Sequence, residues 1–416
     1  MRLLLITNVF PNPTQPTRGT FNLEMTRALR RLGHEVEVVS PVSWVDEWRG
    51  RRRGRRFDAG RHAVWEGIPV YYPRYYYTPR VLRPCYGWFL WYSIRGMLLP
   101  LADRFQPDVV LGYWAHPDGY VAVRLARHIG VPCVAIVGGS DVLILCRQFA
   151  RRRCIMNVFD AVDLVVPVSE DLKRGIEGLG VDPGKVHVCW RGVDPEKFHP
   201  GDRREARRRL GLPPGRPLLL WLGNMVPVKG LETLIDAAAI LKQRGIDFGL
   251  LLVGSGRLEA KLRRRCAARG LEEHVRFVGR VMHDALPDWY RAVNLTVLPS
   301  WSEGIPNVLL ESMASRVPFV ASRVGGIPEI ATEGIDLLVP PGDVTALADA
   351  IATQLSAGDR NGEHPRKLFT WTDAAHEMTR LMYLLKAPAG KGAIECTIKG
   401  AVELAQGRMS PPADAR

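Results

Sequence analysis

The sequence alternates short apolar runs with segments that have apolar residues at helical spacing, and it does so in two separate stretches. In the first stretch, the apolar run 3–6 precedes a helical pattern at 21–32 and a second apolar run at 36–39. This order predicts parallel strands joined by crossover helices. Further strands are expected at 108–111, 134–137 and 164–168, and a helix at 121–128.

The alternation restarts after a break at residues 195–217, which contain five prolines. Strands are expected at 218–222, 248–253, 275–278, 295–298 and 319–321, with helices at 231–241 and 258–268. The sequence therefore predicts an α/β protein with two Rossmann-like, doubly wound domains, at 1–195 and 196–368, that face each other across a cleft. Ligands of such sheets bind beyond the carboxyl ends of the strands, near the N-termini of the following helices. The Ala-, Gly- and Pro-rich segment 387–416 is expected to be poorly ordered.

Composition excludes several protein classes. Hydrophobic residues make up 46% and charged residues 24% of the chain, which is ordinary for a globular protein and not for a disordered or fibrous one. The seven cysteines form no C-x-x-C pair, which argues against a zinc site and indicates a reduced, intracellular environment. No run reaches the roughly 18 apolar residues of a membrane span. We therefore expect a cytoplasmic protein.

Positive charge and aromatic residues concentrate in residues 49–101. The net charge is +14, seven arginines lie between residues 49 and 61, and eleven aromatic residues lie between 65 and 92. Two interpretations stay open: a solvated loop beside a packed aromatic core, or a surface that binds an anionic membrane through its arginines and aromatic rings. Nucleic acid is not an expected partner, because the basic and aromatic residues form separate blocks.

The segment 299–314 carries the sharpest group of candidate functional residues. It reads PSWSEGIPNVLLESMA, so that Glu303 lies in the loop after an expected strand and Glu311 lies among apolar residues of the next helix. A buried carboxylate must be paired or hydrogen-bonded, and sugar and ribose hydroxyls are suitable donors. On spacing alone, two ordinary surface acids are the commoner explanation.

Taken with other segments, this motif resembles the E-x7-E motif of glycosyltransferase family 4, the group 1 glycosyl transferases of GT-B fold. The similar segments are GGIPE at 325–329, WLGNMVPVKGLETL at 221–234, LVGSG at 252–256, VHVCWRGVDPEKF at 186–198 and GGSD at 138–141. The resemblance implies an acceptor-side N-terminal domain and a C-terminal domain that binds a nucleotide-sugar donor. It also implies a terminal helix at about 369–386 that packs back on the N-terminal domain.

The resemblance implies roles for single residues. Glu303 resembles the glutamate that contacts the donor sugar, Glu311 the one that holds the ribose hydroxyls, and Lys229 the lysine that neutralises the donor diphosphate. His116 resembles a histidine at the reaction centre, although a histidine before a proline is, taken alone, more often structural. Further donor-binding residues are expected in loops, namely Gly19, Gly223, Asn224, Gly254 and Gly304.

The charge that grows on a nucleoside diphosphate leaving group must be stabilised. Many glycosyltransferases use a metal ion held by a D-x-D motif, which this chain lacks. Lys229 and helix N-termini can supply the positive field instead. We therefore expect no metal and no cofactor besides the nucleotide-sugar substrate.

Four positions depart from the family pattern, one of them Arg18 before Gly19, where many members carry paired glycines. Asn224 stands where arginine is frequent, Arg191 where asparagine is usual, and Arg316 where a glycine usually follows the Glu311 helix. The turn at Arg316 must therefore tolerate a side chain where glycine would relieve backbone strain.

The sequence thus predicts a retaining glycosyltransferase that transfers a sugar to a lipid-linked or polysaccharide acceptor, peripheral at the inner membrane face. Two alternatives stay open. One is a GT-B relative that epimerises or phosphorolyses its sugar. The other is a degenerate transferase that serves as a binding or scaffold subunit, against which the joint presence of Glu303, Glu311, Lys229 and His116 argues.

Overall fold

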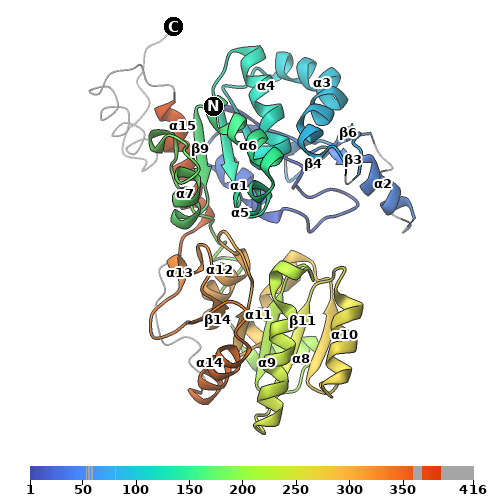
Figure 1. The fold of residues 1–416 in the computed structure, drawn as a ribbon, viewed down its shortest axis with the longest axis vertical. Helices are drawn as coiled ribbons and strands as arrows, with labels where there is room; N and C mark the ends of the chain where they lie inside the picture. Colours follow the sequence, from blue (N-terminus) through green and yellow to red (C-terminus); the bar gives the residue numbers. More distant parts are fainter. Residues whose placement is uncertain (53, 55–56, 58–59, 80, 359–367, 386–416) are drawn as a thin grey trace. The chain divides into compact units, whose positions relative to one another are not determined.

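A computed structural model describes residues 1–385 except 53, 55–56, 58–59, 80 and 359–367, so the expected tail at 387–416 lies outside the described residues. The chain forms two compact units, each built around a largely parallel sheet (Figure 1). The first unit holds residues 1–168, 173–190 and the described residues from 371 onward, and the second holds 169–172 and 191–370. The predicted α/β class with two Rossmann-like domains is confirmed.

The first unit contains a seven-stranded sheet with the order β4-β5-β2-β1-β7-β8-β9. All its neighbouring strands are parallel except β4 and β5, which form an antiparallel hairpin at one edge. The central strands are buried almost throughout, as expected of parallel strands covered on both faces. Their bounds are β1 (Arg2–Ile6), β2 (Glu35–Val39), β4 (His62–Trp65), β5 (Ile68–Tyr71), β7 (Val109–Tyr113), β8 (Cys133–Val137) and β9 (Leu164–Pro167).

Two short strands form a separate parallel pair in this unit, β3 (Val42–Ser43) and β6 (Arg74–Tyr75). The sheet order reverses direction between β1 and β7, which are neighbours although β2 follows β1 in the chain. The helices are α1 (Thr20–Arg31), α2 (Trp44–Arg51), α3 (Tyr86–Phe105), α4 (Tyr120–Ile129), α5 (Ser140–Leu143), α6 (Phe149–Ala161), α7 (Glu170–Glu177, which crosses the unit boundary) and α15 (Trp371–Leu384).

The second unit contains a six-stranded parallel sheet with the order β12-β11-β10-β13-β14-β15. This is the strand order 3-2-1-4-5-6 of nucleotide-binding Rossmann folds, which reverses between β10 and β13. The strands are β10 (Leu218–Leu222), β11 (Gly249–Val253), β12 (Val275–Gly279), β13 (Leu295–Leu298), β14 (Phe319–Ser322) and β15 (Leu337–Val339). The helices are α8 (Arg203–Leu210), α9 (Leu231–Gln243), α10 (Glu259–Ala268), α11 (Leu286–Ala292), α12 (Asn307–Ala314), α13 (Ile327–Ile330) and α14 (Val344–Ser356).

Arg316, which follows α12, has a φ of +57°. The expectation that a side chain occupies a glycine-like turn here is therefore confirmed. A left-handed conformation costs a non-glycine residue roughly 1–2 kcal/mol, so this turn stores strain next to the helix that carries Glu311.

The last described helix, α15, packs against α1, so the two ends of the described chain meet in the first unit. Its buried face includes Ala374, Met378 and Leu381. His34, just after α1, is 6% exposed, and its Nε2 lies 2.9 Å from the Thr379 Oγ1 of α15. Burial and the positive N-terminal amino group lower the pKa of His34 from 6.5 to about 4.

We expect the free energy of unfolding to decrease as the pH falls from about 6.5 to about 4, because the unfolded chain then binds a proton at His34 that the folded chain does not. One such group contributes at most about 1.4 kcal/mol per pH unit. Denaturant unfolding over this pH range should give a flatter dependence for His34→Gln than for the parent. His128→Gln, at an exposed position of α4, is the control, and parallel curves for His34→Gln and the parent would contradict the assignment.

Candidate active site

The carboxyl ends of β10 and β13 bring two opposite charges together. Lys229 ends a 3-10 turn (Pro227–Lys229) in the connection after β10, and Glu303 lies in the loop after β13. The Lys229 Nζ and the Glu303 Oε1 are 2.6 Å apart, and the two side chains are 24% and 10% exposed. Since the strand order reverses between β10 and β13, the pair lies where sheets of this type bind ligands.

Gly230 lets the two connections touch. Its φ is +64°, and a Cβ atom at this position would lie 1.8 Å from the Pro299 carbonyl oxygen. The neighbouring Trp301 N–H donates to the Val228 carbonyl oxygen at 2.8 Å. Only glycine fits here without moving the backbone, so the contact fixes the position of Lys229 against the Glu303 loop.

Four other predicted donor-binding loop residues lie at the same edge of this sheet, whereas Gly19 belongs to the first unit. The Gly223 N–H donates to the Val253 carbonyl oxygen at 3.0 Å, and the Gly254 N–H donates to the Gly279 carbonyl oxygen at 2.7 Å. The Gly304 carbonyl oxygen accepts from the Gly326 N–H at 3.0 Å. Asn224 lies in the connection after β10 with an exposed side chain. The structure thus collects these predicted residues at the ends of adjacent strands.

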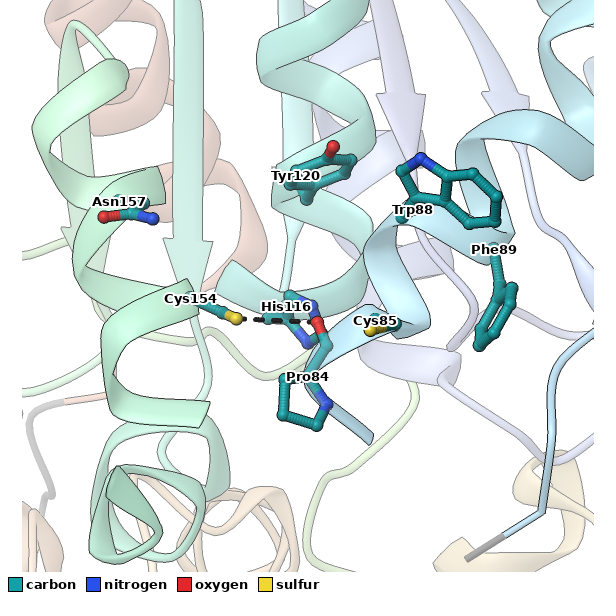
Figure 2. Close-up of a pocket in the computed structure, with 8 residues that line it drawn as sticks. All are labelled: Pro84, Cys85, Trp88, Phe89, His116, Tyr120, Cys154 and Asn157. Carbon is teal, nitrogen blue, oxygen red and sulfur yellow. Dashed lines mark hydrogen bonds between the residues drawn. The ribbon is translucent and has the colours of Figure 1, made fainter. Parts of the chain in front are cut away.

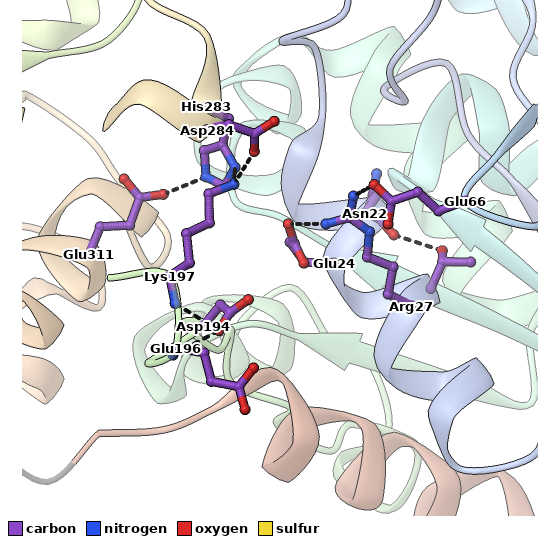
Figure 3. Close-up of polar contacts among 11 residues, drawn as sticks. Asn22, Glu24, Arg27, Glu66, Asp194, Glu196, Lys197, His283, Asp284 and Glu311 are labelled. Carbon is purple, nitrogen blue, oxygen red and sulfur yellow. Dashed lines mark hydrogen bonds and ion pairs between the residues drawn. The ribbon is translucent and has the colours of Figure 1, made fainter. Parts of the chain in front are cut away.

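Glu311 is a buried carboxylate of α12 with a donor for each oxygen. Its Oε2 accepts from the Tyr290 hydroxyl at 2.7 Å, and its Oε1 lies 3.1 Å from the His283 Nε2. The Lys197 Nζ lies 2.9 Å from the His283 Nδ1 (Figure 3). Because an ammonium group can only donate, Nδ1 is the acceptor in that contact, and a neutral ring then carries its proton on Nε2 and donates it to Glu311.

This arrangement holds Glu311 in one orientation while leaving it chemically available. Burial and the charge of Glu311 raise the pKa of Tyr290 well above 10, so the phenol keeps its proton and donates. A carboxylate oxygen can accept about two hydrogen bonds, so each oxygen of Glu311 retains capacity for a ligand hydroxyl.

Sequence reasoning missed Lys197, His283 and Tyr290. They come from the segment before α8, from the 3-10 turn His283–Ala285 and from α11. The sequence signals for two of them were weak. Tyr290 lies in an amphipathic segment, and His283 directly precedes Asp284. Their contact with Glu311 depends on how α11 and α12 pack.

Arg191, which stands where the family usually has asparagine, stabilises the loop after Glu303. Its Nη1 donates to the Ile305 carbonyl oxygen at 3.2 Å and to the Asn307 Oδ1 at 3.0 Å. The departure therefore has a structural role between Glu303 and the start of α12.

The predicted residues of the first unit follow β1 and β7, the strands at which that sheet reverses its order. A Cβ atom on Gly19, whose φ is +67°, would lie 2.2 Å from the Val9 carbonyl oxygen, so this loop also requires glycine. The Asn8 N–H donates to the Asp118 Oδ2 at 3.1 Å and joins the loops after β1 and β7. Burial raises the pKa of Asp118 to about 8.

His116 is 3% exposed, and its Nε2 accepts from the Gly87 N–H of α3 at 3.3 Å. Burial and the charge of Arg151 lower the pKa of His116 to about 4, so the ring is neutral near pH 7. These contacts give His116 a structural function in holding the start of α3. The participation of His116 in catalysis and of Gly19 in donor binding stays a prediction, as does metal independence. Within the described residues, no group of three or more His, Cys, Asp or Glu side chains is arranged to hold a metal ion.

Two protein-family profiles match the chain. The profile described as "Glycosyltransferase Family 4" matches residues 19–197, and the profile described as "Glycosyl transferases group 1" matches residues 216–357. Together they match a large part of each unit. The second match contains Lys229, Glu303 and Glu311, so the geometry at the β10–β13 edge lies inside it.

Individual relatives agree with these profiles. The chain is 27% identical over 361 residues to TuaC of Bacillus subtilis, a glycosyltransferase for which a role in teichuronic acid biosynthesis is proposed, covering 84% of this chain and 88% of that protein. The fold of this chain is similar to that of sucrose-phosphate synthase from Thermosynechococcus elongatus. The TM-score is 0.77 and the identity 22%, and the match covers 92% of this chain and 98% of that one. The fold is also similar to that of Anabaena HepE, solved in complex with UDP-glucose, with a TM-score of 0.67, 18% identity and coverage of 98% and 99%.

We expect Gly230→Ala to destabilise the protein more than Gly245→Ala. Both glycines have positive φ, at +64° and +74°, but a Cβ atom meets backbone only at Gly230 and meets nothing within 4 Å at Gly245. The difference should be about 1–3 kcal/mol, the usual cost of forcing atoms into a packed site. Denaturant unfolding of both variants measures it, and equal losses of stability would show that the loop contact is not tight.

We also expect Tyr290→Phe to lower the free energy of unfolding by about 1–3 kcal/mol, because it removes a donor from the buried Glu311 carboxylate. Tyr383→Phe is the matched control, since Tyr383 is 37% exposed. Thermal and denaturant unfolding compare the two variants. A Tyr290→Phe protein as stable as the control would mean that the hydroxyl contributes nothing to holding Glu311.

Proposed function

Because the chain belongs to glycosyltransferase family 4, the group 1 glycosyl transferases of GT-B fold, we propose that it is a retaining glycosyltransferase of cell-surface polysaccharide biosynthesis. It would move a sugar from a nucleoside diphosphate sugar to a lipid-linked or polysaccharide acceptor. The observation that carries the proposal is the contact of Lys229 with Glu303 where the second sheet reverses its strand order. Glu311 stands on the helix that directly follows.

Lys229 is the cation suited to the donor diphosphate. When the glycosidic bond breaks, negative charge grows on the departing nucleoside diphosphate, and a fixed ammonium stabilises it. The Lys229 ammonium contacts the Glu303 carboxylate in the structure. A diphosphate would compete for that ammonium and free the Glu303 carboxylate to accept hydrogen bonds from the donor sugar. Glu311, held by Tyr290 and His283, would accept the ribose hydroxyls.

The acceptor class is supported by similarity along most of TuaC, whose proposed role is in teichuronic acid biosynthesis. UDP-sugars are the first donors to test, because a protein of similar fold, HepE, was solved with UDP-glucose. Thermal shifts with UDP-, GDP- and ADP-sugars discriminate the bases, since a ligand at 100 times its dissociation constant adds about 2.7 kcal/mol of stability.

The aromatic residues at 65–92 divide between the two interpretations that the sequence left open. Tyr72 is fully buried and Trp91 is 9% exposed, whereas Tyr76, Trp88 and Tyr92 are 57%, 49% and 44% exposed. The last three therefore support a basic, aromatic surface at the cytoplasmic face of a membrane.

Arginines accompany the exposed rings. The Arg52 guanidinium lies 4.1 Å from the ring centroid of Trp48, and that of Arg95 lies 4.4 Å from that of Tyr92. Of the seven arginines between residues 49 and 61, three lie outside the described residues, namely Arg53, Arg55 and Arg56. Arg61 instead pairs with Glu47 at 2.8 Å within the unit. In the part of the chain that the structure describes, no helix is long and apolar enough to cross a bilayer.

We expect donor hydrolysis in the absence of acceptor, and we expect it to persist in EDTA because Lys229 supplies the positive field. Hydrolysis of the donor separates the proposal from two of its alternatives. A scaffold would bind donor without turnover, and a phosphorylase would require phosphate. Loss of activity on chelation that Mg²⁺ or Mn²⁺ restores would contradict metal independence.

Glu303→Gln and Glu311→Gln should have different effects. Glu303→Gln should depress kcat strongly with little change in nucleoside diphosphate affinity, because charge develops at the sugar. Glu311→Gln should weaken nucleoside diphosphate binding by about 1.5–3 kcal/mol, as expected for a lost charged hydrogen bond. Calorimetry with the free nucleoside diphosphate and steady-state kinetics test both. The opposite pattern would reverse the roles of Glu303 and Glu311. If both variants behave like the parent, these two glutamates do not form the donor site.

The protein should co-sediment with anionic vesicles and dissociate as salt rises, because the Debye length shrinks to about 3 Å at 1 M. Replacing Arg51 and Arg52 with serine should weaken sedimentation. Replacing the exposed Arg264 and Arg276 of the second unit makes the same change in net charge and should have less effect. Equal losses in both double variants would indicate a general charge effect and not a binding surface.

A further inference from the structure

An apolar pocket of about 490 Å³ opens on the first unit between the start of α3, α4 and α6 (Figure 2). Its volume falls within the range of about 300–1,000 Å³ that is typical of small-molecule sites. Its lining includes Cys85, Trp88, Phe89, Tyr120 and Cys154, with the buried His116 beside them. Uncovered apolar walls favour a ligand that brings apolar surface of its own.

Two arginines neighbour residues of this lining, since Arg83 directly precedes Pro84 in the chain and the charge of Arg151 lowers the pKa of His116. Arg83 belongs to the 3-10 turn Arg83–Cys85, and Arg151 lies on α6 three residues before Cys154. Within the described residues, no carboxylate forms an ion pair with either guanidinium, and the buried Nε of Arg151 has no hydrogen-bond partner. Burial and the charge of Arg83 lower the pKa of Arg151. Two neighbouring guanidinium groups without a counter-charge favour an anion, and phosphate fits their donor geometry.

We propose that this pocket binds a lipid phosphate acceptor, with the apolar chain against Trp88, Phe89 and Tyr120 and the phosphate or diphosphate at Arg83 and Arg151. The inference rests on the proposed function, because it names the chemical class of the acceptor. A neutral glycan would bring neither an apolar chain nor negative charge, and an acidic glycan would bring no apolar chain. Trp88 belongs both to the pocket and to the exposed aromatic surface, so a lipid chain can extend from the pocket along that surface.

Farnesyl diphosphate is a suitable probe because it combines an isoprenoid chain with a diphosphate. Calorimetry with the full chain should show farnesyl diphosphate binding at least about tenfold more tightly, or about 1.4 kcal/mol, than farnesol or pyrophosphate. Excess UDP should not displace it. Equal affinity for pyrophosphate, or displacement by UDP, would mean that the probe occupies the donor site, and would overturn the proposal.

Single substitutions test the proposed phosphate-binding part and the apolar part of the pocket separately. Arg151→Gln should weaken farnesyl diphosphate binding about tenfold, or about 1.4 kcal/mol, without changing farnesol binding. Cys85→Trp, at an exposed position of the rim, should fill the pocket and weaken both ligands. Arg152→Gln, the exposed neighbour of Arg151 on α6, is the matched control. If Arg151→Gln unfolds early in thermal melts, Arg83→Gln at an exposed position replaces it.

Unchanged affinity in both the arginine and the Cys85→Trp variants would overturn the proposal. Donor hydrolysis by the parent without farnesyl diphosphate binding would refute the lipid phosphate site and leave the proposed function standing. Probe binding that depends on Arg151 and Cys85, without donor hydrolysis, would support the site and count against the proposed transferase activity.

Discussion

The direct contact between the connections that follow β10 and β13 is the constraint on which the second unit's site depends. Gly230 has no side chain, so its backbone can approach the Pro299 carbonyl oxygen, and Lys229 and Glu303 then lie 2.6 Å apart. A partly buried ion pair contributes little net stability, because desolvation of the two charges offsets their attraction. Its presence at the reversal point of the strand order is therefore better explained by ligand binding than by stability.

Glu311 shows the same physical requirement in a more buried setting. A carboxylate that is 7% exposed needs donors, and Tyr290 and His283 provide them. The contact of Lys197 with Nδ1 then determines which imidazole nitrogen carries the proton. The site thus consists of a partly buried ion pair and a carboxylate whose orientation is fixed by two donors.

Buried neutral histidines have structural functions in the first unit. His34 joins the end of α1 to α15, and His116 accepts from the start of α3. Their pKa values near 4 keep both rings uncharged at neutral pH. These two contacts of the first unit therefore need no charge, unlike the ion pair of Arg61 with the buried Glu47.

The sequence by itself determined the two parallel α/β sheets and the position of Glu303 and Glu311 around a strand end, because periodicity and close spacing are local properties of the chain. It did not indicate the hairpin of β4 and β5 (residues 62–71), nor that residues 86–105 form the helix α3. Tertiary structure alone decided that Tyr72 is buried and Trp88 exposed, since neighbouring aromatic residues have the same local pattern. It also decided that His283 and Tyr290 donate to Glu311, because that contact depends on packing between separate elements.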